Sequence, residues 1–392
     1  MSTIARGRAV ISNPVLALLT ATILVAAITL GFVTVAPNRI LSGRPVPIWG
    51  LVDAGTLAAL LLELAVLAVA VVRPPSRRLQ WIVAAAASLL VATLVWAAGS
   101  AAHQAMAAAG TPAARASLGA GFWLMGLAAS LAAADALERL QAPAVLRFGV
   151  ALVVAAAIAA MAWAGRFSDL SLTREFASRG DVFASELARH VWLVLASLAP
   201  ALVIGGALGV LALQRPARAG TIFAALNIVQ TIPSIALFAL MIAPLTALSE
   251  AVPLLRTLGL RGIGPAPAII ALTAYGLLPA ARSVHAAFAG VPPAVIDAAR
   301  GMGMSRWQIL RDVSFPLALP VLLAGLRIVT LQLIGLAVVA ALIGAGGLGT
   351  FVFQGLGQTA TDLVLLGALS AIALALFTDG LLRSLSDLAG AR

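Results

Sequence analysis

The sequence predicts an all-α polytopic membrane protein with about ten transmembrane helices. Of its 392 residues, 62% are hydrophobic and only 10% are charged, and the mean hydropathy is +1.08. Soluble domains carry about 25% charged residues, so this chain has too few polar side chains to cover a surface in water. Its apolar residues also fall into blocks of about 18 to 25, the length that crosses a hydrocarbon layer about 30 Å thick.

Five apolar blocks predict spans in the first half of the chain, at 14–36, 51–72, 80–98, 117–134 and 145–164. The first block follows Arg6 and Arg8, a pattern that a signal peptide also shows. It is too long for a signal peptide and has no small-residue cleavage site, so we interpret it as the first span. A polar connector at 165–190 follows the fifth span, and we expect a short interfacial helix there.

Five further blocks predict spans at 191–213, 219–244, 266–282, 317–343 and 362–382. We place the domain boundary at the connector, which gives an N-terminal membrane extension at 1–190 and a second region at 191–392. Arginine is enriched on cytoplasmic loops, and this rule places both termini in the cytoplasm. The cytoplasmic side then holds most of the arginines: Arg6, Arg8, Arg73, Arg77, Arg78, Arg139, Arg147, Arg215, Arg218, Arg282, Arg300, Arg306, Arg311, Arg327, Arg383 and Arg392.

Composition also excludes several classes of function. The formal charge of +11 would suggest nucleic acid in a soluble chain, but the basic residues, all arginine, are scattered in short gaps between apolar blocks. The chain has no cysteine, which excludes disulfides and thiolate metal sites. Its histidines, His103, His190 and His285, are too widely separated in sequence to suggest a metal site. We therefore expect no bound metal and no nucleic acid.

The most informative segment is the long loop at 290–316, between the eighth and ninth predicted spans. Pro293 suits the first position of a helix, where its missing N–H costs nothing. We expect a helix of about two turns over 294–300, ended by Gly301 and Gly303.

A second short helix is predicted to follow in the same loop. Ser305 and Gln308 have the spacing of a capping box, and we expect Pro316 to end this helix. Small residues, Ala298 and Ala299, lie near the bend between the two helices. The result is either an amphipathic pair lying on the lipid headgroups or a rigid docking element for a soluble cytoplasmic partner.

The loop resembles the EAA loop of the membrane subunits of binding-protein-dependent ABC importers. That pattern is E-A-A, three residues, Gly, nine residues, then I-x-L-P; this chain has D-A-A from 297, Gly303, and V-S-F-P from 313 at the same spacing. The departures, Asp for Glu, Val for Ile and Phe for Leu, conserve chemical character. The resemblance implies that the loop fits a groove on a separate ATPase subunit, through Asp297, Ala298, Ala299, Gly303, Ser305 and Pro316.

The resemblance covers about 190–390 and implies the five-helix core of a type I ABC importer permease. Within it, the segments 230–242, 275–283 and 342–356 look most like the glycine betaine, carnitine and choline importers. It implies a permease subunit in the bacterial inner membrane that forms the pathway for such a quaternary amine. The implied partners are ATPase subunits, an extracytoplasmic solute-binding protein and a second permease subunit, either a copy or a paralogue. Residues 1–190 match no such motif.

The chain lacks the means to hydrolyse ATP by itself. A phosphate-binding loop of the G-x-x-x-x-G-K-[ST] type needs a lysine, and every basic residue here is arginine. We therefore expect a transport subunit that is not an enzyme and binds no cofactor, with ATP and Mg used by the partner ATPase.

Polar residues inside predicted spans are candidates for the pathway or a gate. Glu63 lies in the middle of the second span, where a buried acid is costly and suggests function. Gln230 and Gln332 lie in the seventh and ninth spans, and interhelical hydrogen bonding is the alternative use of such amides. A transport role and a structural hydrogen bond both stay open for Glu63, Gln230 and Gln332.

Three further features of the second half bear on a gate. Pro233 would loosen the hydrogen-bond ladder of the seventh span, as a hinge or as a packing kink. The glycines of 344–349 predict a tight turn, either a gate, a re-entrant element or an ordinary loop. Tyr275 is the only tyrosine, so it cannot form the cage of several aromatic rings that holds quaternary amines.

Alternative functions remain open from the sequence. One is an ABC permease for another small solute, such as an amino acid. A more distant one is a secondary transporter driven by an ion gradient through Glu63, although no glycine or proline correspondence links the two halves. A membrane-embedded enzyme would need acids or histidines clustered at one depth, and none is visible.

Overall fold

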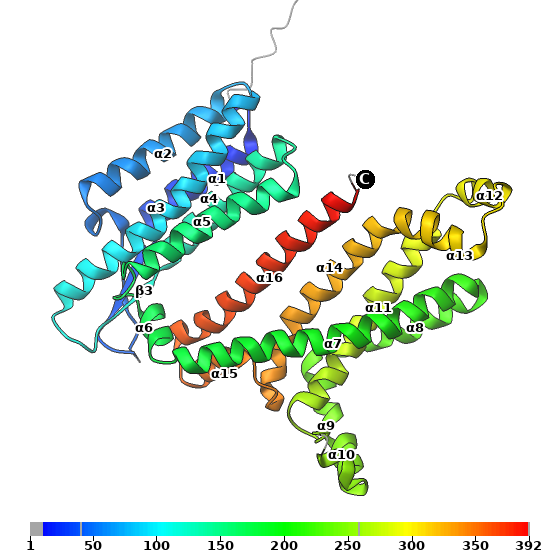
Figure 1. Cartoon of the computed structure of the whole chain (residues 1–392). Helices are drawn as coiled ribbons and strands as arrows, with labels where there is room; N and C mark the ends of the chain where they lie inside the picture. The colour runs from blue at the N-terminus through cyan, green and yellow to red at the C-terminus, as the bar shows by residue number, and fades with distance from the viewer. Residues whose placement is uncertain (1–10, 40, 258, 391–392) are drawn as a thin grey trace, which may run out of the picture. The chain divides into compact units, whose positions relative to one another are not determined.

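The computed structural model of the chain describes residues 11–39, 41–257 and 259–390. They divide into two compact units, unit 1 within Met1–Ser178 and unit 2 within Arg179–Arg392 (Figure 1). Three arginines of the predicted cytoplasmic set lie outside the described residues: Arg6, Arg8 and Arg392.

Most of the described chain is helical, and the predicted all-α membrane fold is confirmed. Nine of the described helices are long and apolar enough to cross a bilayer, where the sequence predicted about ten. The difference lies in the first predicted span, which forms a helix only over Pro14–Thr29. Its 16 residues fall short of the roughly 20 that span a bilayer, because the chain turns into a strand at Val33.

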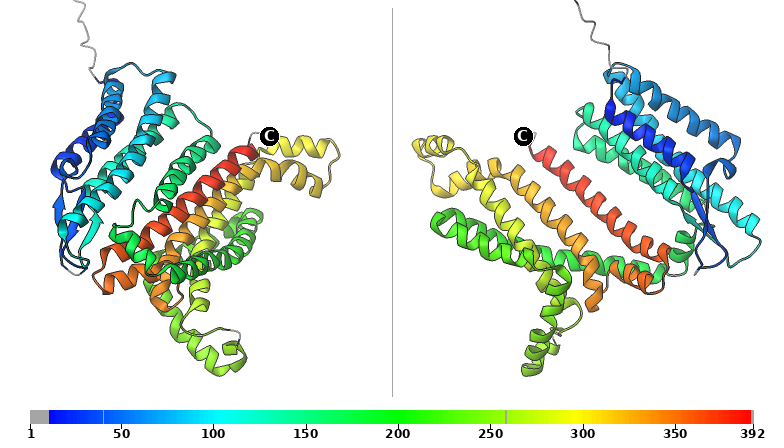
Figure 2. Two further views of the ribbon diagram at one scale, coloured as in Figure 1. Left: turned by 60° about the vertical axis from the view of Figure 1, so that its left-hand side comes forward. Right: turned by 180° about the vertical axis from the view of Figure 1, so that it is seen from behind.

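Unit 1 is a bundle of helices packed side by side (Figure 2). The helix α1 packs against α2 and α4, and α3 packs against α2, α4 and α5. Leu67, Leu90 and Met125 are fully buried between them, together with many alanines that let the helices approach closely. The helices are α1 (Pro14–Thr29), α2 (Ala54–Val72), α3 (Arg77–Ala109), α4 (Ala120–Arg139), α5 (Ala144–Trp163) and the short α6 (Ser171–Ala177), with one 3-10 turn at Ile48–Gly50.

A small antiparallel sheet joins the loops at one end of unit 1, and the sequence did not predict it. Its strands are β1 (Val33–Ala36), β2 (Arg44–Val46) and β3 (Arg115–Leu118), in the order β2-β1-β3. Val33 pairs with Val46 on one side and with Leu118 on the other. Strands of three or four residues are too short to show the alternating pattern that identifies a strand in sequence.

Unit 2 is built around the helix α11. The helices α7 and α14 pack against α11, and α16 packs against α14 and α15. The elements are α7 (Gly180–Gln214), α8 (Pro216–Thr231), α9 (Ser234–Ala251), α10 (Pro253–Thr257), α11 (Pro265–Ala289), α12 (Pro293–Gly301), α13 (Arg306–Gln308), a π-helical turn (Ile309–Ser314), α14 (Phe315–Val339), a 3-10 turn (Ala340–Ile343), α15 (Gly349–Gly357) and α16 (Thr361–Gly390).

The predicted domain boundary at 190 falls inside α7. This helix begins at Gly180, so the division between the units precedes it rather than following the polar connector. The polar residues before His190 continue the helix beyond its apolar part, because a long helix can project past the hydrocarbon layer.

Two glycines of α7 allow it to pack closely on α11. A Cβ added at Gly209 would lie 2.5 Å from the carbonyl oxygen of Ala281, and one added at Gly205 would lie 2.8 Å from the Cβ of Ala280. The two glycines are four residues apart, the small-x-x-x-small spacing that brings membrane helices together. Glycine at these two positions thus lets the backbones of α7 and α11 approach each other closely.

The sequence predicted one continuous span at 219–244, and this prediction is wrong because the segment forms two helices. α8 ends at Thr231 and α9 begins at Ser234, with Pro233 between them. Proline has no N–H to donate to the backbone hydrogen bonds of a helix. Its ring also disfavours the helical conformation of the residue before it. α8 lies beside α7 and α11, and α9 leaves it at an angle (Figures 1 and 2).

Candidate functional site

The 290–316 loop forms the two short helices that the sequence predicted, α12 and α13, at one end of unit 2 (Figure 2). The capping box at the start of α13 is confirmed. The amide of Gln308 donates to Ser305 Oγ at 3.3 Å, and the amide of Ser305 donates to Gln308 Oε1 at 2.8 Å. These reciprocal bonds satisfy amides that a helix start would otherwise leave unpaired.

The turn between α12 and α13 is closed by a Schellman motif. Gly303 has a φ of +80°, in the left-handed region that glycine adopts without steric cost. Its amide donates to the carbonyl of Arg300 at 2.9 Å, and the amide of Met304 donates to the carbonyl of Ala299 at 3.2 Å. The bond from Met304 to Ala299 is the 6→1 bond and the bond from Gly303 to Arg300 is the 5→2 bond, and together they define the Schellman motif. No atom lies within 4 Å of a Cβ added at Gly303, so conformation, not space within this chain, requires glycine here.

Pro316 does not end the second helix of the loop, and that prediction is wrong. The chain passes from α13 through the π-helical turn straight into α14, in which Pro316 lies in the first turn. The amide of Phe315 donates to the carbonyl of Leu310, five residues back. In the wider π-turn the amides donate five residues back instead of four. The helix can therefore continue past Pro316, which has no N–H to donate.

The three residues of the D-A-A motif are placed differently on α12. Asp297 and Ala298 are exposed, whereas Ala299 is buried. Asp297 Oδ1 accepts from Arg300 Nη1 at 2.9 Å, an ion pair that is exposed on both sides. The motif therefore has one face toward the rest of the loop and another, bearing the carboxylate, toward the outside.

Large apolar side chains project from the same loop, and sequence reasoning missed them. Trp307 is 67% exposed and Met302 is 74% exposed, and they flank the turn at Gly303. Exposed tryptophan and methionine are typical of interaction surfaces. The sequence alone did not separate them from other apolar residues of the loop, such as Val291, Ile296 and Ile309, which are buried or half-buried.

Three of the predicted pathway residues meet at one backbone carbonyl in the middle of unit 2. Gln230 Nε2, on α8, donates to the carbonyl of Tyr275 at 2.6 Å, and Gln332 Nε2, on α14, donates to the same carbonyl at 3.4 Å. In a regular helix this carbonyl would accept from the amide four residues later, but that residue is Pro279. The two glutamines thus donate from neighbouring helices to a carbonyl that Pro279 leaves without its usual helical hydrogen bond.

The Tyr275 side chain compensates for the break at Pro233 in a matching way. Its hydroxyl donates to the carbonyl of Ile232, which lies between α8 and α9. Tyr275 is buried, so this bond satisfies both polar groups. Two helix defects, at Pro233 and at Pro279, are therefore joined through one residue.

Glu63 lies in unit 1, on α2, and is only 5% exposed. Its Oε1 accepts from Thr93 Oγ1 of α3 at 2.8 Å, whereas its Oε2 has no hydrogen-bond partner within the described part of the chain. The contact with Thr93 is an interhelical bond, and a role in transport stays a prediction.

The predicted tight turn at 344–349 is confirmed. Gly344, Gly346 and Gly347 all have positive φ. Two residues near the start of α7 hold the turn: Glu186 Oε2 accepts from the amide of Gly347, and Arg189 Nε donates to the carbonyl of Ala345 at 3.1 Å. α15 follows directly and packs along α16. The sequence did not identify the α7 residues because they lie about 160 positions away.

The polar connector contains the predicted short helix, α6, and an ion-paired acid just before it. Asp169 Oδ2 lies 2.7 Å from His103 Nδ1, and its Oδ1 accepts from Arg174 Nη2 at 3.1 Å. The bond with His103, helped by Arg174, lowers the pKa of Asp169 below its ordinary value of 3.8. This cluster fastens the connector to the end of α3.

Comparison with known proteins covers both units. Residues 179–387 match the family described as binding-protein-dependent transport system inner membrane component. Residues 12–173 match the N-terminal domain of the ABC transporter permease YehY.

Individual relatives match about half of the chain. The chain is 41% identical over 202 residues to the osmoprotectant import permease protein OsmW of Salmonella typhimurium, covering 52% of this chain and 89% of that protein. It is 33% identical over 202 residues to the glycine betaine/carnitine/choline transport system permease protein OpuCB of Bacillus subtilis, covering 52% and 86%. A solved chain of the MetNI methionine ABC transporter, in an inward-facing conformation, is 30% identical with a TM-score of 0.41, covering 52% and 95%.

Proposed function

Because the chain belongs to the family of binding-protein-dependent transport system inner membrane components, as an importer permease subunit, we propose that it imports an osmoprotectant. The solute class is a quaternary amine such as glycine betaine, carnitine or choline. The observation that carries this proposal is the 41% identity with an osmoprotectant import permease over 202 residues, 52% of this chain and 89% of that protein.

The 290–316 loop is the proposed contact with a separate ATPase. Three features support this assignment: the rigid Schellman turn at Gly303, the outward carboxylate of Asp297, and the exposed Trp307 and Met302. Aromatic residues that fill a partner's pocket often dominate the affinity of an interface. The ATPase would use ATP and Mg, and this chain would bind neither.

The loop and both termini are proposed to lie in the cytoplasm, with the chain in the bacterial inner membrane. Arg300, Arg306 and Arg311 lie in or beside the loop, in keeping with the excess of arginine on cytoplasmic segments. A solute-binding protein would then dock at the opposite side, and a second permease subunit would complete the pathway.

The cluster of Gln230, Tyr275 and Gln332 is the proposed part of the pathway or gate within unit 2. Its polar groups sit where α8, α11 and α14 meet, at helix breaks of the kind that transporters use around a pathway. Asp297, Ala298, Ala299, Gly303, Ser305 and Pro316 remain the proposed coupling residues, with Pro233 and Glu63 as further pathway candidates.

Reconstitution in liposomes tests the proposal. The full chain, its ATPase and its binding protein are combined, and uptake of labelled glycine betaine is measured with each component left out in turn. We expect uptake only when all three and ATP are present. Uptake by the chain alone, driven by a proton or sodium gradient, would contradict the proposal and favour a secondary transporter. Uptake of methionine but not glycine betaine would contradict the solute class only.

A tryptophan pair tests the loop itself. Trp307→Ala should weaken ATPase binding by about 30-fold or more, since removing a central aromatic anchor costs at least about 2 kcal/mol. Trp163→Ala is the matched control, because Trp163 is 95% exposed but lies in unit 1 at the end of α5. Equal ATPase affinity of both variants would remove Trp307 from the interface.

A further inference from the structure

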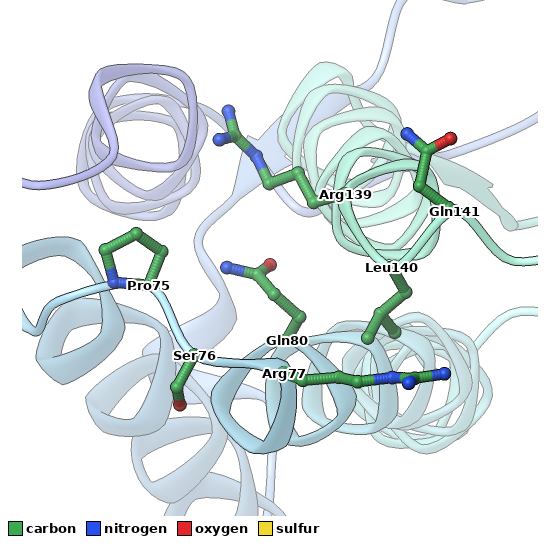
Figure 3. Close-up of a pocket in the computed structure, with 7 residues that line it drawn as sticks. All are labelled: Pro75, Ser76, Arg77, Gln80, Arg139, Leu140 and Gln141. Atoms are coloured by element: carbon green, nitrogen blue, oxygen red, sulfur yellow. The ribbon is translucent and has the colours of Figure 1, made fainter.

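Unit 1 has a pocket of about 670 Å³ at the end where α3 begins and α4 ends (Figure 3). The start of α3 contributes Ser76, Arg77 and Gln80 to its lining, and the end of α4 with the following turn contributes Arg139, Leu140 and Gln141. Most of these side chains are polar, and no carboxylate is among the described residues that line the pocket. The pocket is therefore shaped for a polar ligand with negative charge.

Two arginines set the charge of this pocket. Arg139 is fixed in place, because its Nε pairs with Asp135 at 2.7 Å and its Nη2 donates to Asn13 Oδ1 at 3.3 Å. Its guanidinium group has further N–H donors beyond these two. Arg77 lies along the rim beside Leu140 (Figure 3) and is exposed. The two arginines outweigh the single charge of Asp135.

Gln80 is the observation that points to an occupant. It is only 7% exposed, and its Oε1 has no hydrogen-bond partner within the described part of the chain. Its amide and the guanidinium of Arg139 extend toward the same side of the pocket (Figure 3). A buried polar atom without a partner costs about 1–3 kcal/mol, so a ligand that donates a hydrogen bond to Gln80 would be favoured.

The start of α3 adds donors of its own. Ser76 caps the helix by accepting from the amide of Leu79 at 3.2 Å. The amides of Arg77 and Arg78 precede this capped amide in the first turn of α3, and such first amides have no partner within the helix and favour an anion through their partial positive charge.

The neighbourhood of this pocket suits a position at the level of lipid headgroups. α2 ends and α5 begins at the same end of the unit, which brings Arg73 and Arg147 into the set of arginines there. Trp81, the residue after Gln80, is 41% exposed, and tryptophan prefers the boundary between hydrocarbon and water. Basic pockets between membrane helices at this depth suit anionic headgroups.

We propose that this pocket binds a phosphate group that carries its own hydrogen-bond donor, as in the headgroup of phosphatidylglycerol. The phosphate oxygens accept from Arg139 and the first amides of α3, while Arg77, whose guanidinium extends toward the other side of the pocket in Figure 3, adds positive charge at the rim. A glycerol hydroxyl donates to Gln80 Oε1. Hydrogenphosphate offers the same chemistry, with oxygens that accept and one hydroxyl that donates, so a free anion is the other source of this ligand.

Neighbouring arginines provide the matched test. The full chain is purified in a neutral detergent, and binding of phosphatidylglycerol and of phosphatidylcholine is measured by native mass spectrometry. We expect Arg77→Gln to weaken phosphatidylglycerol binding about fivefold, the loss typical of one arginine near a membrane surface. Arg78→Gln, one position along and outside the pocket lining, should bind like the unmodified chain. Phosphatidylcholine, which has no donor and no net charge, should bind weakly to all three.

A second arm identifies the source of the phosphate. Inorganic phosphate is added to the same three proteins, and the midpoint of thermal unfolding is followed. Stabilisation of the unmodified chain and of Arg78→Gln but not of Arg77→Gln, without a preference for phosphatidylglycerol, would support the pocket with a free anion as its ligand. The proposal is overturned if neither probe distinguishes Arg77→Gln from Arg78→Gln.

Discussion

Gly303 is the residue whose substitution tests most directly how the 290–316 loop works. In Gly303→Ala the new Cβ meets no atom within 4 Å, so the folded loop has room for it. The cost is conformational, because the φ of +80° lies in the left-handed region, where an ordinary L-residue pays about 1–2 kcal/mol. If the loop must hold this turn to bind its ATPase, the apparent affinity should fall about 5- to 30-fold.

Two further substitutions separate conformation from crowding. Asparagine tolerates the left-handed region better than alanine although it is larger, so Gly303→Asn should retain more ATPase binding than Gly303→Ala. Gly301→Ala is the control for a methyl group added nearby, since Gly301 lies in α12 and its Cβ also meets no atom. That change should leave binding unaltered and stabilise the helix by about 0.5–1 kcal/mol.

The assay is the affinity of the detergent-solubilised chain for its purified ATPase, measured by surface-immobilised binding. Thermal unfolding of each variant serves as the check that the chain remains folded. If Gly303→Asn binds more weakly than Gly303→Ala, size rather than backbone conformation decides, and the glycine is needed for a tight fit in the partner's groove. Equal binding by all variants would refute the requirement for this turn altogether.

Three other expectations can be measured on the purified chain. Gln230→Leu should cost about 1–2 kcal/mol in stability, and less in a Pro279→Ala background, because the restored amide then serves the Tyr275 carbonyl; equal costs would contradict this. Gly209→Leu should destabilise by about 3 kcal/mol, since a Cβ there would lie 2.5 Å from a backbone oxygen, whereas Gly206→Leu, with its nearest atom at 3.8 Å, should be tolerated. The folded-state pKa of Asp169 is lowered, so its carboxylate stabilises at pH values above the unfolded-state pKa and this contribution disappears as pH falls through the lower folded-state value. The unmodified chain should therefore lose stability below about pH 4 relative to Asp169→Asn, and parallel pH profiles would count against the ion pair.

The positions of the membrane helices could be predicted from the sequence because hydropathy acts over about 20 residues at a time. The same averaging explains the errors. Within the block at 219–244 the few polar residues near Pro233, such as Gln230 and Ser234, are uncharged and scattered among apolar ones, so hydropathy shows one span where the backbone forms two helices. The strands around Val33 were missed for the opposite reason, since three or four residues are too few to show a pattern.

Local signals predicted the 290–316 loop well, because caps and turns depend on residues a few positions apart. The capping box of Ser305 and the glycine turn at 303 are of this kind. The meeting of Gln230 and Gln332 at the carbonyl of Tyr275 is not, since it joins residues 45 and 57 positions apart. A proline four residues after a buried carbonyl was the available clue, and it shows that an acceptor is free but not which donor reaches it.

The two ends of the 290–316 loop are attached to unit 2 with unequal stiffness. On one side α12 is joined to α11 through Gly290, Val291 and Pro292, which are not helical. On the other side the helical path from Arg306 runs without interruption to Ile343, 38 residues and roughly 55 Å at about 1.5 Å per residue. A force on the loop would therefore bend the non-helical connection to α11. The long helical path through α14 would instead transmit the displacement along its length. The far end of that path is the glycine turn held by Glu186 and Arg189, so mechanical displacement at one end of the unit has a direct route to the other.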